Sequence, residues 1–254
     1  MSFINYVKPI IKENQRLYDF LRKVREVLPD KKYLYENRIE ILGGKAVCLD
    51  LIEAGSTIIS GGIGNDVEFE KLCIYKKNVK VIGFDPTDTA ELFITKCNYS
   101  KKFHQNYEFN KLAITADGQP IKLYYADDDF MSSASSDHKN VLGTNYKVCE
   151  SVSLDDIIIK NTNISYLKLD IEGPEYEIIN NLDAINIPQI SIEFHHHCDK
   201  SFTLEDTISC VRKLVDMGYE VFDYGEFHGR KRKLPKYVSK WSDLNCEFLF
   251  IKSK

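Results

Sequence analysis

The sequence lacks a long apolar run and lacks any closely spaced cysteine pair. No stretch of its 254 residues approaches the roughly 20 apolar residues that span a bilayer, and the N-terminal segment has no signal-peptide apolar run. The seven cysteines include no CxxC pair, and an odd number cannot close completely into intrachain disulfides. These absences predict a cytoplasmic protein with no membrane span, in a reducing compartment.

The sequence also has little excess charge of either sign. Its 34 basic residues nearly balance 38 acidic ones, so a net charge of −4 gives no global attraction for nucleic acid or anionic membrane. Internal repeats and Pro/Ser-rich linkers are missing, and 43% hydrophobic residues exclude a largely disordered chain. The length and composition predict one large α/β domain, residues 57–254, with an N-terminal helical extension over residues 1–56.

Apolar periodicity predicts how the chain is organised. Residues 9–28 have the spacing of an amphipathic helix, and a weaker helical stretch covers about 45–54. From residue 57 onward, short β-rich runs alternate with helical stretches, which predicts a doubly wound, mostly parallel sheet. The segments 219–224 and 247–251 have no helix between them and are expected to pair antiparallel at one edge. The expected strands are 57–60, 79–84, 121–125, 166–171, 189–194, 219–224 and 247–251, and the expected helices are 66–75, 88–97, 175–182 and 204–217.

A glycine-rich turn follows the first of these strands. Gly61, Gly62 and Gly64 allow a sharp bend and close approach of a ligand to the backbone, and the next helix N-terminus favours a carboxylate or phosphate. Asp85 ends the next strand 21 positions after Gly64, near the roughly 20-residue spacing at which a carboxylate binds ribose hydroxyls. Together they indicate a bound nucleoside. They do not by themselves indicate NAD, because Val67 stands where a dinucleotide motif requires a third small residue.

Two acidic residues follow the strand at 166–171. Asp170 and Glu172 are expected to share a face at the edge where a doubly wound sheet binds its ligands. Two neighbouring carboxylates that are partly buried raise the pKa of one of them, which suits a general base or a hard-metal site.

Histidines and a basic stretch supply the remaining candidates. Strand alternation places Glu193, His195 and His197 on one side, where a histidine base or a metal site is conceivable, and a structural role stays open. A basic stretch between the last two strands suits either a solvated loop or a grip on phosphates. Its candidate substrate-binding residues are Arg230, Arg232 and Lys233.

These motifs, in this order and spacing over about residues 57–200, resemble the FkbM-type methyltransferases. The most specific block is Lys-Leu-Asp-Ile-Glu-Gly at 168–173. The resemblance implies the class I methyltransferase fold, a Rossmann-like seven-stranded sheet with an antiparallel edge strand, and S-adenosyl-L-methionine as cofactor. By the same resemblance Gly61, Gly62 and Gly64 surround the methionine part, Asp85 holds the ribose and Asp170 faces the reacting centre. Asp66, which ends the glycine-rich motif, is grouped with the cofactor-binding residues.

The resemblance implies O-methylation of a sugar or polyketide hydroxyl. We therefore predict an O-methyltransferase acting on a carbohydrate, a nucleotide-linked or phosphorylated sugar in polysaccharide biosynthesis. The proton acceptor is sought among Asp170, Glu172, His195 and His197, and no metal is assigned. An NAD-dependent oxidoreductase and a non-catalytic nucleoside-binding module stay open. The expected partner is a small molecule rather than a nucleic acid, and a homodimer is left open.

Overall fold

The computed structural model describes residues 35, 38–126, 132–139, 141, 145–224, 236–238, 241 and 246–253. The chain divides into two units, Met1–Asn37 and Arg38–Lys254, and every element below belongs to the second unit. The helix expected over 9–28 lies outside the described residues. No described helix has the length and apolar character that crossing a membrane requires.

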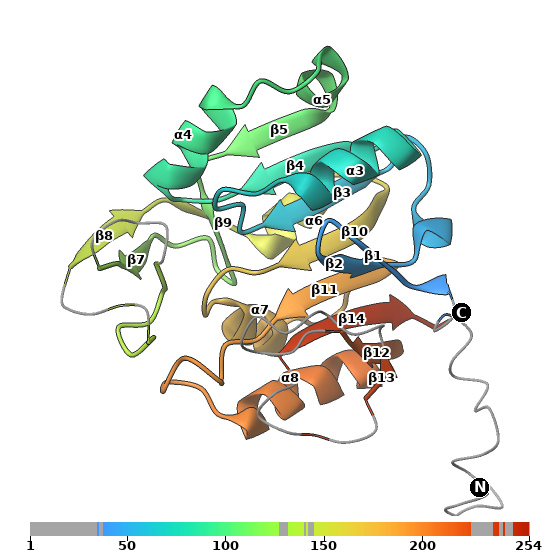
Figure 1. Ribbon diagram of the computed structural model, residues 1–254. Coiled ribbons are helices and arrows are strands. Elements are labelled where there is room, and N and C mark those ends of the chain that lie inside the picture. Colours follow the sequence, from blue (N-terminus) through green and yellow to red (C-terminus); the bar gives the residue numbers. More distant parts are fainter. Residues whose placement is uncertain are drawn as a thin grey trace, which may run out of the picture. The chain divides into compact units, whose positions relative to one another are not determined.

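A mixed sheet forms the centre of the second unit, with the order β13-β12-β14-β11-β10-β3-β4-β5 (Figure 1). The strands from β5 to β11 run parallel, and β14 pairs antiparallel with both β11 and β12. The fold is therefore the α/β Rossmann-like arrangement that was expected. The strands are β3 (Thr57–Gly61), β4 (Lys80–Phe84), β5 (Tyr107–Asn110), β10 (Ile164–Leu169), β11 (Gln189–Glu193), β12 (Tyr219–Asp223), β13 (Lys236–Tyr237) and β14 (Glu247–Lys252).

Two details of the expected sheet differ. The sheet has eight described strands, and its antiparallel β14 lies inside it, between β11 and β12, rather than at the edge. Burial explains the position of β14, because five of its six residues are buried, a pattern of strands covered on both faces. The antiparallel pairing of β12 with β14 is as expected.

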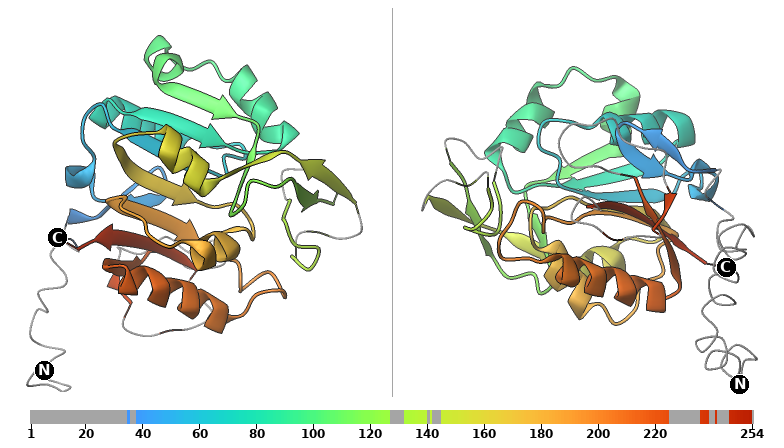
Figure 2. Two further views of the ribbon diagram at one scale, coloured as in Figure 1. Left: turned by 180° about the vertical axis from the view of Figure 1, so that it is seen from behind. Right: turned by 60° about the horizontal axis from the view of Figure 1, so that its bottom comes forward.

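Helices cover one face of the sheet, seen from behind in the left view of Figure 2. The helices α6, α7 and α8 pack on alternate strand residues such as Ile59, Leu167 and Ile190 in one continuous core. Side-chain caps define two of the starts: Ser153 accepts from the Asp156 N–H, and Thr203 forms a capping box with Asp206. The bounds are α6 (Leu154–Lys160), α7 (Glu175–Asn181) and α8 (Leu204–Asp216).

The opposite face carries α3 (Glu68–Lys77) and a small hairpin of β1 (Glu40–Leu42) and β2 (Lys45–Val47). Tyr166 of β10 donates to the Ala46 carbonyl at 2.7 Å, and Gln189 of β11 hydrogen-bonds both backbone groups of Cys48. The expected helix over 45–54 is therefore wrong. Gly43 and Gly44, both with positive φ, form a tight hairpin turn there, and a 3-10 turn follows at Leu49–Leu51.

The segment expected as a strand at 121–125 does form one, but outside the central sheet. It is β7 (Ile121–Tyr124), which pairs with β8 (Tyr146–Cys149) in a hairpin at the left of Figure 1. The sheet position beside β4 is taken instead by β5, which the apolar pattern did not indicate. The remaining elements are α4 (Asp88–Lys96), α5 (Lys101–Asn106), β6 (Ala113–Thr115) and β9 (Ser151–Ser153).

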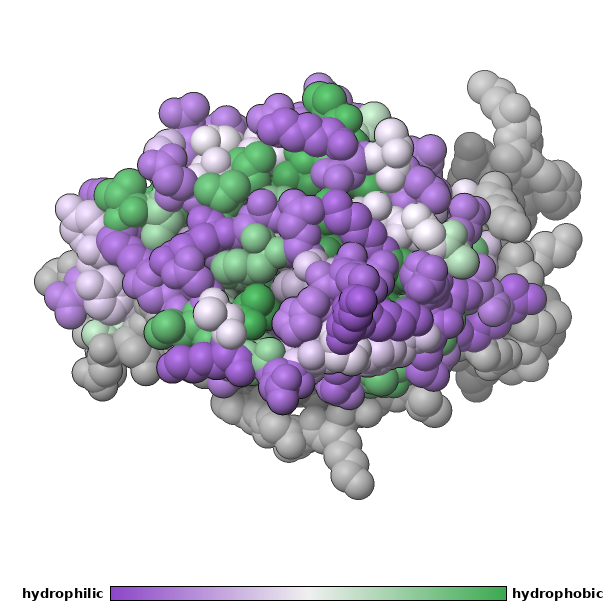
Figure 3. Space-filling model, turned by 90° about the horizontal axis from the view of Figure 1, so that it is seen from above, coloured by the Kyte–Doolittle hydropathy of each residue, from purple (hydrophilic) through white to green (hydrophobic). Residues whose placement is uncertain are grey.

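The face seen from above is mostly hydrophilic, with hydrophobic residues in small separate areas (Figure 3). Single exposed apolar side chains, such as that of Leu92 on α4, are normal on protein surfaces.

Candidate active site

A cleft of about 390 Å³ opens at the carboxyl ends of β3, β4, β10 and β11. This is the edge at which open α/β sheets bind ligands. Its described walls combine the glycine-rich turn with apolar side chains from Ile63, Ala113 and Ile114. Among the residues that the structure describes, seven carboxylate residues line it and two basic ones, Lys45 and Lys168. The acidic residues are Asp66, Glu68, Glu70, Asp85, Asp170, Glu172 and Glu193.

The turn after β3 packs directly against the end of β10. Gly62 has φ +78°, and a Cβ atom there would stand 1.7 Å from the Asp170 carbonyl oxygen. The Lys168 ammonium donates to the Gly61 and Gly62 carbonyls from the neighbouring strand. Only glycine fits this position, because it tolerates positive φ and has no side chain.

Asp85 ties the same turn to the end of β4. Its Oδ2 accepts from the N–H groups of Ile63 at 2.8 Å and Gly64 at 2.9 Å. Its Oδ1 accepts from the Thr87 N–H at 2.9 Å and the Thr87 hydroxyl at 2.5 Å. A carboxylate has about four acceptor positions. Asp85 therefore has a full set of protein donors in this structure.

Lys45 lies among three carboxylates at the base of the cleft. Its Nζ is 3.0 Å from Asp170, 3.4 Å from Glu193 and 3.1 Å from Glu247. Burial lowers the pKa of Lys45, but Asp170 and Glu193 outweigh it and raise that pKa well above the usual value. Lys45 is therefore a fixed positive charge.

The two cleft carboxylates beside Lys45 differ in basicity. Burial raises the pKa of Asp170, but Lys45, Lys168 and His195 outweigh it, and the pKa falls far below the usual range. Burial also raises the pKa of Glu193, the Asp170 charge adds to this, and Lys45 opposes it, which leaves a pKa of about 8. Crowded like charges commonly push neighbouring pKa values apart in this way.

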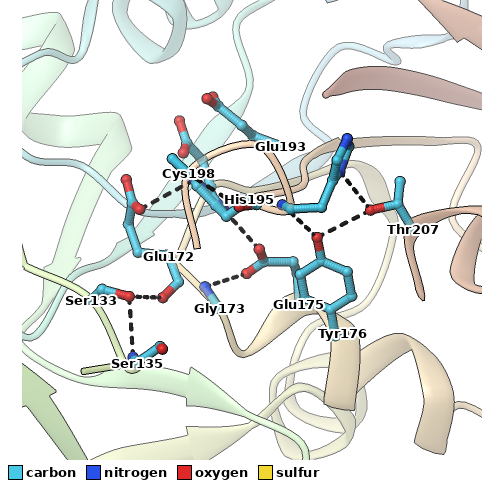
Figure 4. Close-up of polar contacts among 12 residues, drawn as sticks. Ser133, Ser135, Glu172, Gly173, Glu175, Tyr176, Glu193, His195, Cys198 and Thr207 are labelled. Carbon is cyan, nitrogen blue, oxygen red and sulfur yellow. Dashed lines mark hydrogen bonds and ion pairs between the residues drawn. The ribbon is translucent and has the colours of Figure 1, made fainter. Parts of the chain in front are cut away.

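His195 lies between two carboxylates, as Figure 4 shows. Its Nδ1 is 2.7 Å from Glu175 Oε1, and its Nε2 is 3.2 Å from Glu172 Oε2. Burial lowers the pKa of His195, but Glu172 and Glu175 outweigh it and raise that pKa well above the usual value. A protonated ring with both nitrogens engaged is poorly placed to accept a proton from a substrate.

The carboxylate of Glu172 is also close to a second histidine. His138 Nε2 is 3.3 Å from Glu172 Oε2, and the backbone of Glu172 has a positive φ of 58°. The Ser133 hydroxyl and the Ala134 N–H both donate to the Glu172 carbonyl and fix this conformation. Strained backbone of this kind is often found at functional sites.

One group of described residues has the spacing of a metal site. The ligand atoms of Asp170, Glu193 and His195 lie within 4.8 Å of one another. However, the Lys45 ammonium contacts both carboxylates, and both His195 nitrogens face Glu172 and Glu175. The lysine ammonium therefore occupies the place that a metal ion would take between the two carboxylates, and this set of donors does not favour a metal.

The comparison with family models decides the family. The model described as the methyltransferase FkbM domain matches residues 54–221, well over half of the chain. The chain belongs to the FkbM methyltransferase family. The resemblance noted in the motifs is thereby confirmed.

Comparisons with individual proteins add little to the FkbM assignment. No curated protein matches the chain. Among solved structures, a precorrin-6y C5,15-methyltransferase from Geobacter metallireducens GS-15 is 14% identical, with a TM-score of 0.41, covering 81% of this chain and 84% of that one. A 16S rRNA (adenine(1408)-N(1))-methyltransferase from Catenulisporales acidiphilia is 13% identical, with a TM-score of 0.36, covering 84% and 94%. Scores this low carry no information on substrate.

The cleft of this FkbM domain contains part of the expected site. Gly62, Gly64, Asp66, Asp85, Asp170 and Glu172 line it, whereas Gly61, His195 and His197 are not among its described lining residues. The His195 and His197 rings are nevertheless neighbours, with centroids 6.2 Å apart. Burial lowers the pKa of His197 to about 3, and the nearby His195 adds to this effect. Arg230, Arg232 and Lys233 lie outside the described residues.

Sequence patterns missed Lys45 and gave Glu193 only a conceivable metal role. Glu193 ends β11 as Asp170 follows β10, so the strand-end reasoning applied to Asp170 would have made it a candidate base as well. Lys45 had a weaker signal: the Gly43-Gly44 pair between two apolar runs is typical of a hairpin turn. Because a helix was expected over 45–54, the position of Lys45 beside the sheet was not predicted.

Proposed function

We propose that this FkbM domain transfers a methyl group from S-adenosylmethionine to a hydroxyl oxygen of a carbohydrate, a nucleotide-linked or phosphorylated sugar in polysaccharide biosynthesis. Class I methyltransferases generally use this cofactor, which supplies an electrophilic methyl group on a sulfonium. The observation that carries the proposal is the acidic cleft behind the glycine-rich turn, with seven carboxylate residues and two lysines among its described walls.

The charge of the cleft supports a sulfonium nucleoside over a dinucleotide. A positively charged ligand is attracted by a cleft lined with carboxylates, whereas the pyrophosphate of NAD would be repelled. The apolar side chains of Ile63, Ala113 and Ile114 offer a surface for a nucleoside base. This favours S-adenosylmethionine over the NAD-dependent alternative.

The chain's own residues have distinct tasks in this proposal. Gly62 and Gly64 let the cofactor approach the backbone, with Gly61 and Asp66 beside them. Asp85 holds the turn, and its contact with the ribose remains a prediction, because protein donors already occupy its four acceptor positions. Asp170 faces the reacting centre, where its charge stabilises the positive methyl group. The rate then depends on aligning the acceptor oxygen and removing its proton. His195 and His197 remain predictions for that base, and neither lines the described cleft.

The acceptor class rests on the sequence. The family resemblance favours a sugar hydroxyl, and the basic residues Arg230, Arg232 and Lys233 suit a phosphate on that sugar. A small-molecule partner in place of a nucleic acid remains a prediction of the same kind, and so does a cytoplasmic location.

Calorimetry and a labelled-methyl assay test the proposal. S-adenosylmethionine and S-adenosylhomocysteine should bind, whereas NAD should not, and label should pass to a member of a panel of nucleotide sugars, sugar phosphates and free sugars. An RNA oligonucleotide belongs in the same panel. Binding of NAD alone would favour the oxidoreductase, and cofactor binding with no transfer to any acceptor would favour a non-catalytic module.

A further inference from the structure

We infer that Glu193 is the catalytic base of this cleft, and that Lys45 is the positioning residue that orients its carboxylate toward the acceptor hydroxyl. This inference rests on the proposed function, because it assigns the proton-removing step of the methyl transfer. It goes beyond the expected bases, which did not include Glu193. It also gives the β1–β2 hairpin a role, because this hairpin carries Lys45.

Geometry singles out Glu193 among the acids of the cleft. It stands at the end of β11 beside Asp170, lines the cleft, and keeps a side-chain exposure of 25%. Glu247, the third acid on Lys45, is only 7% exposed and does not line the cleft. Of the three carboxylates on Lys45, Asp170 and Glu193 line the cleft, where an acceptor can reach them. Asp170 makes the shorter contact with Lys45, which leaves Glu193 as the more available base.

The other candidates are already engaged. Asp170 has the shortest contact with Lys45, 3.0 Å, and Lys168 and His195 add positive charge around it. Glu172 and Glu175 face the two nitrogens of His195. Asp170 is therefore a weak base, because the surrounding cations strongly stabilise its charged form, and Glu172 and Glu175 are occupied by their ion pairs with His195.

The surroundings of Glu193 support the assignment. The groups that face it are Lys45 from β2, Asp170 after β10, Glu247 from β14 and His195 after β11. Burial and the negative charges of Asp170 and Glu247 raise its pKa, and Lys45 and His195 oppose them, for a value of about 8. A general base works best when its pKa lies near the operating pH.

The step balances without a further reactant. An oxygen lone pair of the acceptor forms the new O–CH₃ bond as the C–S bond of the sulfonium breaks, and the bonding electrons stay on sulfur. The products are a methyl ether and neutral S-adenosylhomocysteine. The hydroxyl proton passes to the Glu193 carboxylate and leaves to solvent when the product departs.

The first test needs no acceptor. In protein carrying ¹³C-labelled glutamate side chains, the Glu193 signal is identified by its loss in Glu193→Gln and then titrated by NMR, with and without S-adenosylhomocysteine. We expect a midpoint near pH 8. Lys45→Met should move it up by about 1 pH unit or more, because an opposite charge at this distance has been removed. Glu247→Gln should move it down, because a like charge has been removed.

The second test uses turnover with the acceptor from the labelled-methyl panel. Glu193→Gln should lower kcat by roughly 10²–10⁴-fold, with S-adenosylhomocysteine affinity unchanged within about threefold. The wild-type kcat should rise with pH, reach half its maximum near pH 8 and level off above that, and Lys45→Met should shift the rise to higher pH. Lys45→Arg keeps the charge and should restore the wild-type profile. Glu108→Gln, on an exposed pair with Lys80, is the matched control and should leave kcat unchanged.

The outcomes separate the two proposals. A Glu193 midpoint near the usual glutamate value of about 4.3, or near-normal kcat in Glu193→Gln, overturns the inference while the methyl transfer stands. A wild-type chain that binds neither S-adenosylmethionine nor S-adenosylhomocysteine overturns the proposed function instead. If Lys45→Met does not fold, the opposite shift in Glu247→Gln and the titration of the wild type still decide the matter.

Discussion

Replacing Asp85 with alanine should destabilise the fold as well as the cofactor site. Asp85 is 5% exposed and accepts four hydrogen bonds from three backbone N–H groups and one hydroxyl. Removing a ligand-binding carboxylate that only faced solvent would change the protein's free energy of unfolding very little. This one holds the turn after β3 to the end of β4, so its loss leaves buried donors without acceptors.

The structure gives the scale of the effect. A hydrogen bond to a charged group contributes about 1.5–3 kcal/mol, and the four are not additive because they share one carboxylate. We expect Asp85→Ala to lower the free energy of unfolding by about 3–5 kcal/mol, in the range of the more damaging substitutions. For a domain of this size that corresponds to about 6–20 °C in Tm.

Urea and thermal unfolding measure this directly, with Asp117→Ala as the matched control. Asp117 accepts one hydrogen bond, from the Gln119 N–H at 2.9 Å, in an exposed turn. Its loss should lower the free energy of unfolding by less than about 1 kcal/mol. If Asp85→Ala is no more destabilised than Asp117→Ala, the four hydrogen bonds do not hold the turn, and Asp85 serves the ligand alone.

Three further substitutions test other parts of the site. Gly62→Ala should prevent folding or destabilise the chain severely, because its Cβ meets the Asp170 carbonyl, whereas Gly55→Ala, with the same φ of +78° and no atom within 4 Å, should cost only about 1–2 kcal/mol in urea unfolding. Glu172 and Glu175 raise the His195 pKa despite burial, so protonated His195 contributes stability that is complete below about pH 6.5 and is lost as pH rises through the raised folded-state pKa. The difference in unfolding free energy between wild type and His195→Gln should shrink over that range, and a difference independent of pH would contradict this. Neutralising Arg230 and Arg232 together should raise KM for a phosphorylated sugar and leave the free-sugar rate unchanged; equal kcat/KM for both acceptors would leave these residues as a solvated loop.

Much of the fold follows from local patterns, because buried parallel strands read as short apolar runs between helices. The strands β3, β4, β10, β11, β12 and β14 all lie within a few residues of their expected positions. The exceptions are short or half-exposed. All four residues of β5 are intermediate or exposed, and its sequence, Tyr-Glu-Phe-Asn, carries too little apolar character to stand out. β14 becomes an internal strand through contacts with β11 and β12, which local sequence does not specify.

The site could be predicted only where recognisable motifs end neighbouring strands and therefore meet. The glycine-rich turn and the Lys168–Gly173 block meet because β3 and β10 are adjacent parallel strands. The chemistry of the carboxylates depends instead on distant partners. Lys45 reaches Glu193 across 148 residues and Glu247 across 202.

Basicity in this cleft is therefore a property of the assembled fold rather than of any motif. Asp170 and Glu193 lie at the ends of neighbouring strands and look equivalent in the sequence, yet the pKa of Asp170 is lowered and that of Glu193 is raised. The difference arises because three cations surround Asp170, whereas Glu193 takes the longer contact with Lys45 beside two other carboxylates. A proton shared among crowded carboxylates settles on the one with the least cationic support. The β1–β2 hairpin, which places Lys45, thus decides which carboxylate can accept a proton near neutral pH.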